Sequence, residues 1–343
     1  MESNTNSLIE RKPTAFAAGM IYLIVLILLM VSSFLAGRYE LKGNDTYIVM
    51  FVIQIVTILL PPLLYLMIKK IKIKKTIRLN RISLSEFFLT IGMAVFGYGA
   101  VIPINLVWAY ILSKIGTPQA GSLPEMYSPT QYLLALLVIA VTPAIVEEFL
   151  VRGVMMRGYE KYGTRTSIVL TGALFALLHL SIVSLPAIIL MGIILCYIVY
   201  RSNSLFTGII YHLTNNAIAV TLVYMTSIFN QFIPTGEETV ESIADIPDAQ
   251  MVLMIIIVSI MGLIALALFG ACFAGFIRIT REKHRAAKQA KIEAQKAAMA
   301  DADTVQPVTT RLPRFVELIP TFLAILIIVG MLVLEVLRMA NLV

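Results

Sequence analysis

The sequence predicts an all-α fold, a polytopic bundle of about nine transmembrane helices. Hydrophobic residues make up 59% of the 343 residues and charged residues only 14%, a composition far more apolar than that of a soluble domain. Apolar runs of about 20 residues, the length at which a helix crosses a bilayer, recur from one end of the chain to the other. We therefore expect an integral, multi-pass membrane protein that has the lipid bilayer as a partner.

Nine apolar runs are counted as spans. They comprise residues 14–36, 46–68, 87–112, 132–151, 166–185, 186–200, 205–229, 251–277 and 313–338. The first is too long for the apolar region of a signal peptide, so we interpret it as an uncleaved anchor. The second contains Pro61 and Pro62. Its last turns should be kinked or irregular, because proline cannot donate a backbone hydrogen bond.

Basic residues cluster between the apolar runs. The formal net charge is +7, and seven lysines and arginines fall within residues 69–81. Such clusters are typical of cytoplasmic loops, and they argue against a nucleic-acid partner. From a cytoplasmic N-terminus, nine spans place the C-terminus outside. Residues 230–250 contain acidic but no basic side chains, which fits an outer loop. We expect the plasma membrane of a bacterium as the location.

A basic stretch follows the eighth run. Residues 278–296 have a helix-forming composition, and we expect them to continue the span into the cytoplasm before a linker at residues 300–312. The simplest interpretation is a solvated helix held near anionic lipid, with His284 solvated as well. Cys196 and Cys272 lie inside apolar runs without a CxxC spacing, which disfavours a disulfide or a thiolate metal site.

Two carboxylates and a guanidinium, Glu147, Glu148 and Arg152, lie at the end of the fourth run. An ionisable group inside a span usually faces the protein interior or a water-filled cavity and has a partner. Glu148 and Arg152 are four residues apart, so they share a helical face and can pair. Such a pair can also be purely structural. Glu147 is turned about 100° away, so we expect it to point elsewhere.

Two further pairs have the same spacing, Phe175 with His179 and His212 with Asn216. A carboxylate and an imidazole that converge on one water can activate it for attack on a carbonyl, while further donors stabilise the oxyanion. Taken singly, each histidine would be an interhelical hydrogen-bonding residue and Phe175 a packing residue. Two of the chain's three histidines nevertheless lie in spans near one Glu-Glu pair, and this coincidence favours a hydrolytic site.

Packing and depth give two more expectations for this region. Gly172 and Ala176 should form a small-residue strip where another helix approaches closely. Burial should suit Glu147 to act as a base. By helix rise, Glu147, His212 and His179 lie about 8, 11 and 20 Å from the cytoplasmic ends of their spans, although one site needs them level. We expect the fifth helix to start well below residue 166, which would remove the difference.

The ordered trio Glu147-Glu148-x-x-x-Arg152, Phe175-x-x-x-His179 and His212-x-x-x-Asn216 resembles the three-motif signature of the CAAX protease and bacteriocin-processing family (CPBP, also called Abi). That family comprises intramembrane endopeptidases related to the eukaryotic type II CAAX prenyl endopeptidase. The resemblance covers about a quarter of the chain. It implies three sets of roles. Glu147 and His179 activate the attacking water, His212 and Asn216 stabilise the oxyanion, and Glu148, Arg152 and Phe175 order the site.

The resemblance also suggests an organisation and a substrate. We expect an N-terminal region of three spans with a basic loop (residues 1–130) and a catalytic helical core (131–229). A third region (230–343) would hold the acidic outer loop, two further spans and the basic segment. The expected partner is a hydrophobic, lipid-modified or leader-type peptide, or the tail of a membrane protein.

The sequence leaves alternatives open for both the cofactor and the function. The glutamate-and-water mechanism requires no cofactor. Zinc stays open, since Glu147, His179 and His212 could supply the three protein ligands of a hydrolytic zinc site, although the H-E-x-x-H motif is absent. The alternative function is a non-catalytic membrane scaffold or immunity protein. A proton-coupled transporter is the third, and the lack of an internal repeat counts against it.

Overall fold

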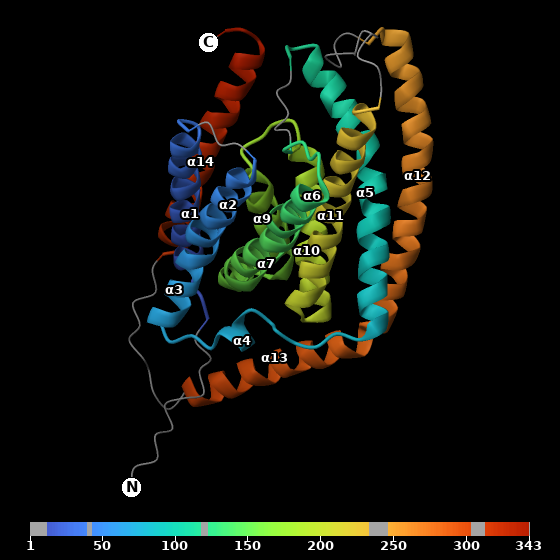
Figure 1. Ribbon diagram of the computed structural model, residues 1–343. Helices are drawn as coiled ribbons and strands as arrows, with labels where there is room; N and C mark the ends of the chain where they lie inside the picture. The colour runs from blue at the N-terminus through green and yellow to red at the C-terminus, as the bar shows by residue number, and fades with distance from the viewer. Residues whose placement is uncertain (1–11, 40–42, 118–122, 233–245, 303–312, 343) are drawn as a thin grey trace.

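The computed structural model describes residues 12–39, 43–117, 123–232, 246–302 and 313–342. Over these residues the chain forms helices and no strand, and the helices pack into a bundle (Figure 1). Within them, eight helical stretches are long and apolar enough to cross a membrane. The predicted all-α transmembrane bundle is therefore confirmed, with eight long spans and one shorter apolar helix.

The elements run in a simple order along the chain. They are α1 (Ala15–Ala36), α2 (Asn44–Ile53), η1 (Gln54–Leu59), α3 (Leu60–Ile68), α4 (Ile73–Thr76), α5 (Leu84–Ser113), α6 (Pro129–Ala135), η2 (Leu136–Val141), α7 (Thr142–Glu148), η3 (Phe149–Met155), α8 (Met156–Tyr159), η4 (Glu160–Tyr162), α9 (Thr164–Leu177), α10 (Leu185–Ser202), α11 (Leu205–Asn230), α12 (Asp248–Ile279), α13 (Arg281–Ala302) and α14 (Arg314–Met339). The elements η1, η2 and η3 are π-helical, and η4 is a 3₁₀ turn. The stretch from α2 to α3 forms one long helix, as does the stretch from α6 to η4.

The central helices are covered on two sides. α5 and α12 pack side by side along one edge of the bundle, and α1 and α14 along the opposite edge, with α7, α9, α10 and α11 between them (Figure 1). A large buried apolar cluster joins α1, η3, α9 and α14 through side chains such as Tyr22, Leu150, Phe175 and Ile328. The last helix of the chain thus supports the central segment directly.

One end of the bundle, which we call the basic end, carries the short helix α4 and the helix α13, which runs across the ends of the other helices (Figure 1). At this end Arg78 and Arg157 both pair with Glu160. Most of the predicted outer loop (230–250) and most of the predicted linker (300–312) lie outside the described residues. Cys196 and Cys272 are both free, as expected.

The fifth predicted span is shorter than expected. α9 ends at Leu177, so it is about 20 Å long, against a hydrocarbon thickness of about 30 Å. Beyond it the backbone turns, with a left-handed Leu180 (φ 51°). Ile182 then donates its N–H to Glu335 (2.9 Å), and its carbonyl accepts from Trp108 (2.8 Å). The apolar run continues to residue 185 although the helix does not, because side chains of α5 and α14 satisfy this non-helical backbone.

The expected difference in depth between Glu147 and His179 disappears for a reason that we did not predict, whereas His212 stays about 11 Å from the start of α11. α9 begins at Thr164, only two residues before the predicted start. The larger change is in the fourth helix, which continues past Val151 to Tyr162. Glu147 is therefore about 22 Å from the basic end of its helix, close to the value of about 20 Å for the far end of α9.

Proline residues explain two of the π-helical segments. η1 ends shortly before Pro61 and Pro62, and η2 shortly before Pro143. A proline has no N–H for the carbonyl four residues earlier, so the preceding turn widens to the i→i−5 pattern. The irregularity expected in the second span exists, but it lies in the turn before the prolines. The last turns, in α3, are regular α-helix.

α12 and α13 do not form the single continuous helix that we expected. α12 ends at Ile279, and α13 starts at Arg281 in a new direction across the basic end (Figure 1). Arg201 of α10 causes the break, because its guanidinium donates to the Ile277 carbonyl (2.9 Å) and to the Thr280 hydroxyl (3.2 Å). These bonds satisfy polar groups at the end of α12, and the basic stretch then lies along the end of the bundle.

Candidate active site

Glu148 and Arg152 form a fully buried ion pair. Arg152 Nη1 lies 2.7 Å from Glu148 Oε1, and both side chains are 0% exposed. Arg152 also donates from Nη2 to the Gly192 carbonyl (3.1 Å), and its guanidinium carbon is 4.3 Å from the centre of the Phe175 ring. The pairing predicted from the i, i+4 spacing is confirmed. Arg152 belongs to the π-helical segment η3, and such segments often occur at functional sites.

His212 lies between the two glutamates. Its Nδ1 is 3.0 Å from Glu148 Oε1, and its Nε2 is 3.9 Å from Glu147 Oε2. The imidazole is 2% exposed and the Glu147 side chain 16% exposed. Glu147 Oε2 has no hydrogen-bond partner among the described residues. We expected Glu147 and Glu148 to face different ways. The structure places the two carboxylates on opposite sides of the His212 ring, and Glu148, expected only to pair with Arg152, also meets Nδ1.

Phe175 links the two histidines. Its ring is buried and meets both imidazoles edge to face, with centroid distances of 4.9 Å to His179 and 5.7 Å to His212. His179 follows the end of α9, has an exposed side chain, and lies with Nδ1 2.9 Å from the Phe175 carbonyl oxygen. Because a carbonyl only accepts, Nδ1 carries the proton. Nε2 of the neutral His179 ring is then free of a proton.

Asn216 reaches the same region from α11 and contacts the π-helical segment η2. Its Nδ2 donates to the Ile139 carbonyl (3.1 Å). That carbonyl would bond to the N–H of residue 143 in a regular α-helix, but Pro143 has none. Gln54 binds the neighbouring Val138 carbonyl in the same way (2.9 Å). Two side-chain amides from other helices thus replace the bonds that the widened turn leaves unmade.

Glycines that sequence reasoning did not connect with the site allow its close packing. A Cβ on Gly208 would lie 2.5 Å from Glu148 Oε2, so only glycine leaves room for that carboxylate. Gly208 is one turn before His212 on α11, and this spacing was the available signal. The close approach predicted for Gly172 is confirmed, because a Cβ there would lie 2.7 Å from the Ile193 backbone of α10.

A third intramembrane carboxylate was also missed. Glu335 of α14 accepts the Ile182 N–H at 2.9 Å, and Trp108 of α5 donates to the Ile182 carbonyl at 2.8 Å. Both contacts hold the turn that directly follows His179. The signal in the sequence was the rule already applied to Glu147, because a lone glutamate inside an apolar run needs a polar partner.

The residues named as zinc ligands do not fit that metal. Among the described residues, no group of three or more His, Cys, Asp and Glu side chains is arranged to hold a metal ion. A hydrolytic zinc site generally requires three protein ligands. We therefore derive no step through a metal.

Comparison with known proteins gives a match over the same region. Residues 129–218 match the family model described as type II CAAX prenyl endopeptidase Rce1-like. The match begins with α6, includes all the residues named above on α7, η3, α9 and α10, and ends within α11, two residues after Asn216. No curated protein and no solved structure matches the chain.

Proposed function

Residues 129–218 match the family model of the type II CAAX prenyl endopeptidase, and from this match we propose that the protein is an intramembrane endopeptidase of the glutamate type. Water attacks a peptide carbonyl directly, without a covalent acyl-enzyme. The observation that carries the proposal is the buried, unpartnered Glu147 Oε2, which lies 3.9 Å from His212 Nε2 inside the matched region. This separation is too long for a direct hydrogen bond, so the carboxylate oxygen keeps its acceptor capacity for a catalytic water.

Glu147 and His179 activate the water. Glu147 accepts a proton from it as the oxygen forms a bond to the carbonyl carbon, and the proton then passes to the leaving amine as the C–N bond breaks. His179 supports this step because its protonated Nδ1 is bound to the Phe175 carbonyl. Its Nε2 can therefore accept a hydrogen bond from the water. The products are a carboxylate and an amine.

His212 and Asn216 stabilise the oxyanion. This role requires a proton on both ring nitrogens of His212, because the Glu148 carboxylate and the oxyanion only accept hydrogen bonds. In that state Nδ1 donates to Glu148 (3.0 Å), and the N–H at Nε2 can donate to the developing oxyanion. Asn216 donates one amide N–H to the Ile139 carbonyl. Its second N–H can donate to the oxyanion. Glu148 and Arg152 act as positioning residues.

The substrate is a hydrophobic, lipid-modified or leader-type peptide, or the tail of a membrane protein. Clusters of lysine and arginine support a cytoplasmic basic end. α9 is short and is followed by a turn at residues 178–184, so His179 lies where the helical wall of the bundle is interrupted. This interruption supports entry of a peptide segment from the membrane region.

The proposal is tested with the purified full-length protein in liposomes. Fluorogenic peptides with and without a C-terminal prenylated CAAX sequence are presented, and a proton-flux measurement is made on the same liposomes. Cleavage that Glu147→Gln abolishes supports the peptidase. Proton flux that Glu147→Gln abolishes, with no cleavage, would indicate a transporter instead. If neither cleavage nor proton flux is detected with a library of hydrophobic peptides, the result would favour the non-catalytic scaffold.

A further inference from the structure

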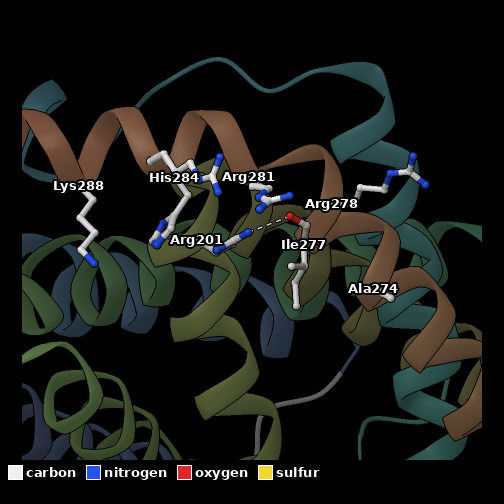
Figure 2. Close-up of a pocket in the computed structure, with 8 residues that line it drawn as sticks. Arg201, Ala274, Ile277, Arg278, Arg281, His284 and Lys288 are labelled. Atoms are coloured by element: carbon white, nitrogen blue, oxygen red, sulfur yellow. Dashed lines mark hydrogen bonds between the residues drawn. The ribbon is translucent and has the colours of Figure 1, made fainter.

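The basic end contains a pocket that is separate from the candidate active site. It lies between the ends of α10 and α12 and the first turns of α13, and its volume is ≈ 450 Å³ (Figure 2). Cationic side chains and two apolar ones form its walls. The lining residues are Arg201, Ala274, Ile277, Arg278, Arg281, His284, Arg285 and Lys288.

The charge of this pocket is almost entirely positive. Four arginines and one lysine line it, and no aspartate or glutamate does. The nearby acid on α13, Glu282, pairs with Arg285 at 3.4 Å, and both side chains are highly exposed. Such an exposed pair offsets little of the local charge. An anion in the pocket would relieve the mutual repulsion of the remaining cations.

Arg201 is held in place at the inner wall. It donates to Ile277 and Thr280 (2.9 and 3.2 Å), which fixes its guanidinium at the junction of α12 and α13. Figure 2 shows His284 and Lys288 extending from α13 towards the level of Arg201. These three side chains come from two helices that meet only in the folded protein.

His284 is not solvated as the sequence suggested. It is partly buried, and its ring meets Tyr200 edge to face at a centroid distance of 5.4 Å. Burial and the neighbouring charge of Arg201 lower the pKa of this imidazole. The charge part of this effect comes from Arg201 and Lys288, two cations that line the pocket beside the ring.

The position of the pocket indicates what kind of anion it takes. Its floor, Ala274 and Ile277, is the last part of the apolar helix α12. Only 6% of the most apolar stretch of α12 is buried, and its exposed side chains include Leu263, Leu266 and Leu268. The polar part of a ligand bound here would contact the cationic side chains, and its apolar part would lie along the exposed apolar surface of α12. Basic pockets at helix ends on one side of a membrane bind phosphate-bearing head groups.

We propose that this pocket binds the phosphate-bearing head group of an anionic phospholipid, with the acyl chains lying along α12. Arg201, Arg281 and Lys288 bind the phosphate, and His284 donates to it when protonated. The lipid would hold α13 against the basic end. This binding does not depend on peptidase activity and can be measured whatever the outcome of the cleavage assay.

The test is direct binding to the full-length protein, delipidated in an uncharged detergent. A fluorescent short-chain phosphatidylglycerol is titrated, with the phosphatidylcholine analogue as the neutral lipid. Lys288→Gln should weaken phosphatidylglycerol binding about fivefold, and Arg281→Gln with Lys288→Gln about 25-fold, since each such cation contributes about that factor. Lys296→Gln is the control, because it removes the same charge from the same helix outside the pocket. It should change the affinity for phosphatidylglycerol less than about twofold, since a single exposed charge contributes little.

Two results would overturn the proposal. Equal weakening by Lys288→Gln and Lys296→Gln would mean general attraction to a basic helix and no pocket. Displacement of the lipid by inorganic phosphate at a similar concentration would mean that the head-group phosphate alone is recognised, as a free anion. Helical circular dichroism of each variant confirms that it is folded before its binding is compared.

Discussion

His212 Nδ1 lies 3.0 Å from Glu148 Oε1, and the same carboxylate oxygen accepts from Arg152 at 2.7 Å. Glu148 is therefore shared by a cation on its own helix and an imidazole on α11. Since all three side chains are at most 2% exposed, their geometry does not depend on solvent. The ring of His212 is held with Nε2 directed to Glu147, and the proposed chemistry depends on this orientation.

The buried ion pair gives a prediction about stability. Arg152→Met leaves the Glu148 carboxylate buried without its cation, and we expect a loss of roughly 3–5 kcal/mol, seen as a lower melting temperature in detergent. Arg285→Met removes one member of an exposed pair and should cost about 0–1 kcal/mol. The double variant Glu148→Gln with Arg152→Met should recover part of the stability. A melting temperature for Arg152→Met equal to that of the wild type would contradict the buried geometry.

A second prediction concerns the space beside Glu148. Gly208→Ala places a methyl group 2.5 Å from Glu148 Oε2, so the carboxylate or the helix must move. We expect a loss of about 1–3 kcal/mol in stability together with most of the cleavage activity. Gly270→Ala is the matched control, because that glycine also lies in a membrane helix and has nothing within 4 Å of its Cβ position. If both variants lose activity equally, the close packing at Gly208 is not responsible.

Contacts between residues close in sequence could be predicted, whereas contacts between distant helices could not. The Glu148–Arg152 pair is local, and the i, i+4 rule was enough. The contact of His212 with both glutamates joins α7 to α11 and had no local signal beyond the motif resemblance. Gly208 was missed because a glycine in an apolar helix usually reflects only close packing, and its particular neighbour is set by tertiary structure.

The fold shows the same limit. Eight spans follow from hydropathy, which depends on side chains alone. The end of α9 was missed because residues 178–184 continue the largely apolar run without a glycine or proline, whereas Glu335 and Trp108, far away in sequence, satisfy the Ile182 backbone. The break between α12 and α13 was missed for the same reason, since Arg201 of α10 binds the Ile277 carbonyl. In both places a distant polar side chain decides where a helix ends.

Chelation tests the metal-free mechanism. The side chains of Glu147, His179 and His212 do not form a three-ligand metal group within the described residues, so we expect cleavage to survive treatment with EDTA or 1,10-phenanthroline. The measurement is the initial cleavage rate before and after dialysis against chelator, with metal content followed by mass spectrometry. Loss of activity that added zinc restores would require a different arrangement of these ligands during turnover.

The imidazole of His284 gives a pH-dependent prediction outside the membrane spans. Its pKa is lowered from 6.5 by burial and then by the charge of Arg201, with Lys288 adding to the effect. A histidine with a lowered pKa in the folded protein favours the neutral form. Its stabilising contribution is therefore present above pH 6.5 and is lost as the pH falls below that value.

We accordingly expect the melting temperature of the wild type to fall more than that of His284→Gln between about pH 7 and pH 5. The difference between the two proteins isolates His284 from other titrating groups. Bound phosphatidylglycerol should reduce this difference, since an anion next to the ring favours its protonated form. Parallel pH profiles for the two proteins without lipid would rule out the buried position of His284.

The most direct test of the proposed mechanism is the single-turnover cleavage rate of Glu147→Gln in liposomes. The substitution keeps the size of the side chain and removes the base, so we expect the rate to fall about 10²- to 10⁴-fold with the melting temperature almost unchanged. Glu293→Gln, on the exposed face of α13, serves as the control and should cleave like the wild type. A Glu147→Gln protein that is folded and cleaves within about tenfold of the wild-type rate would show that Glu147 is not the base.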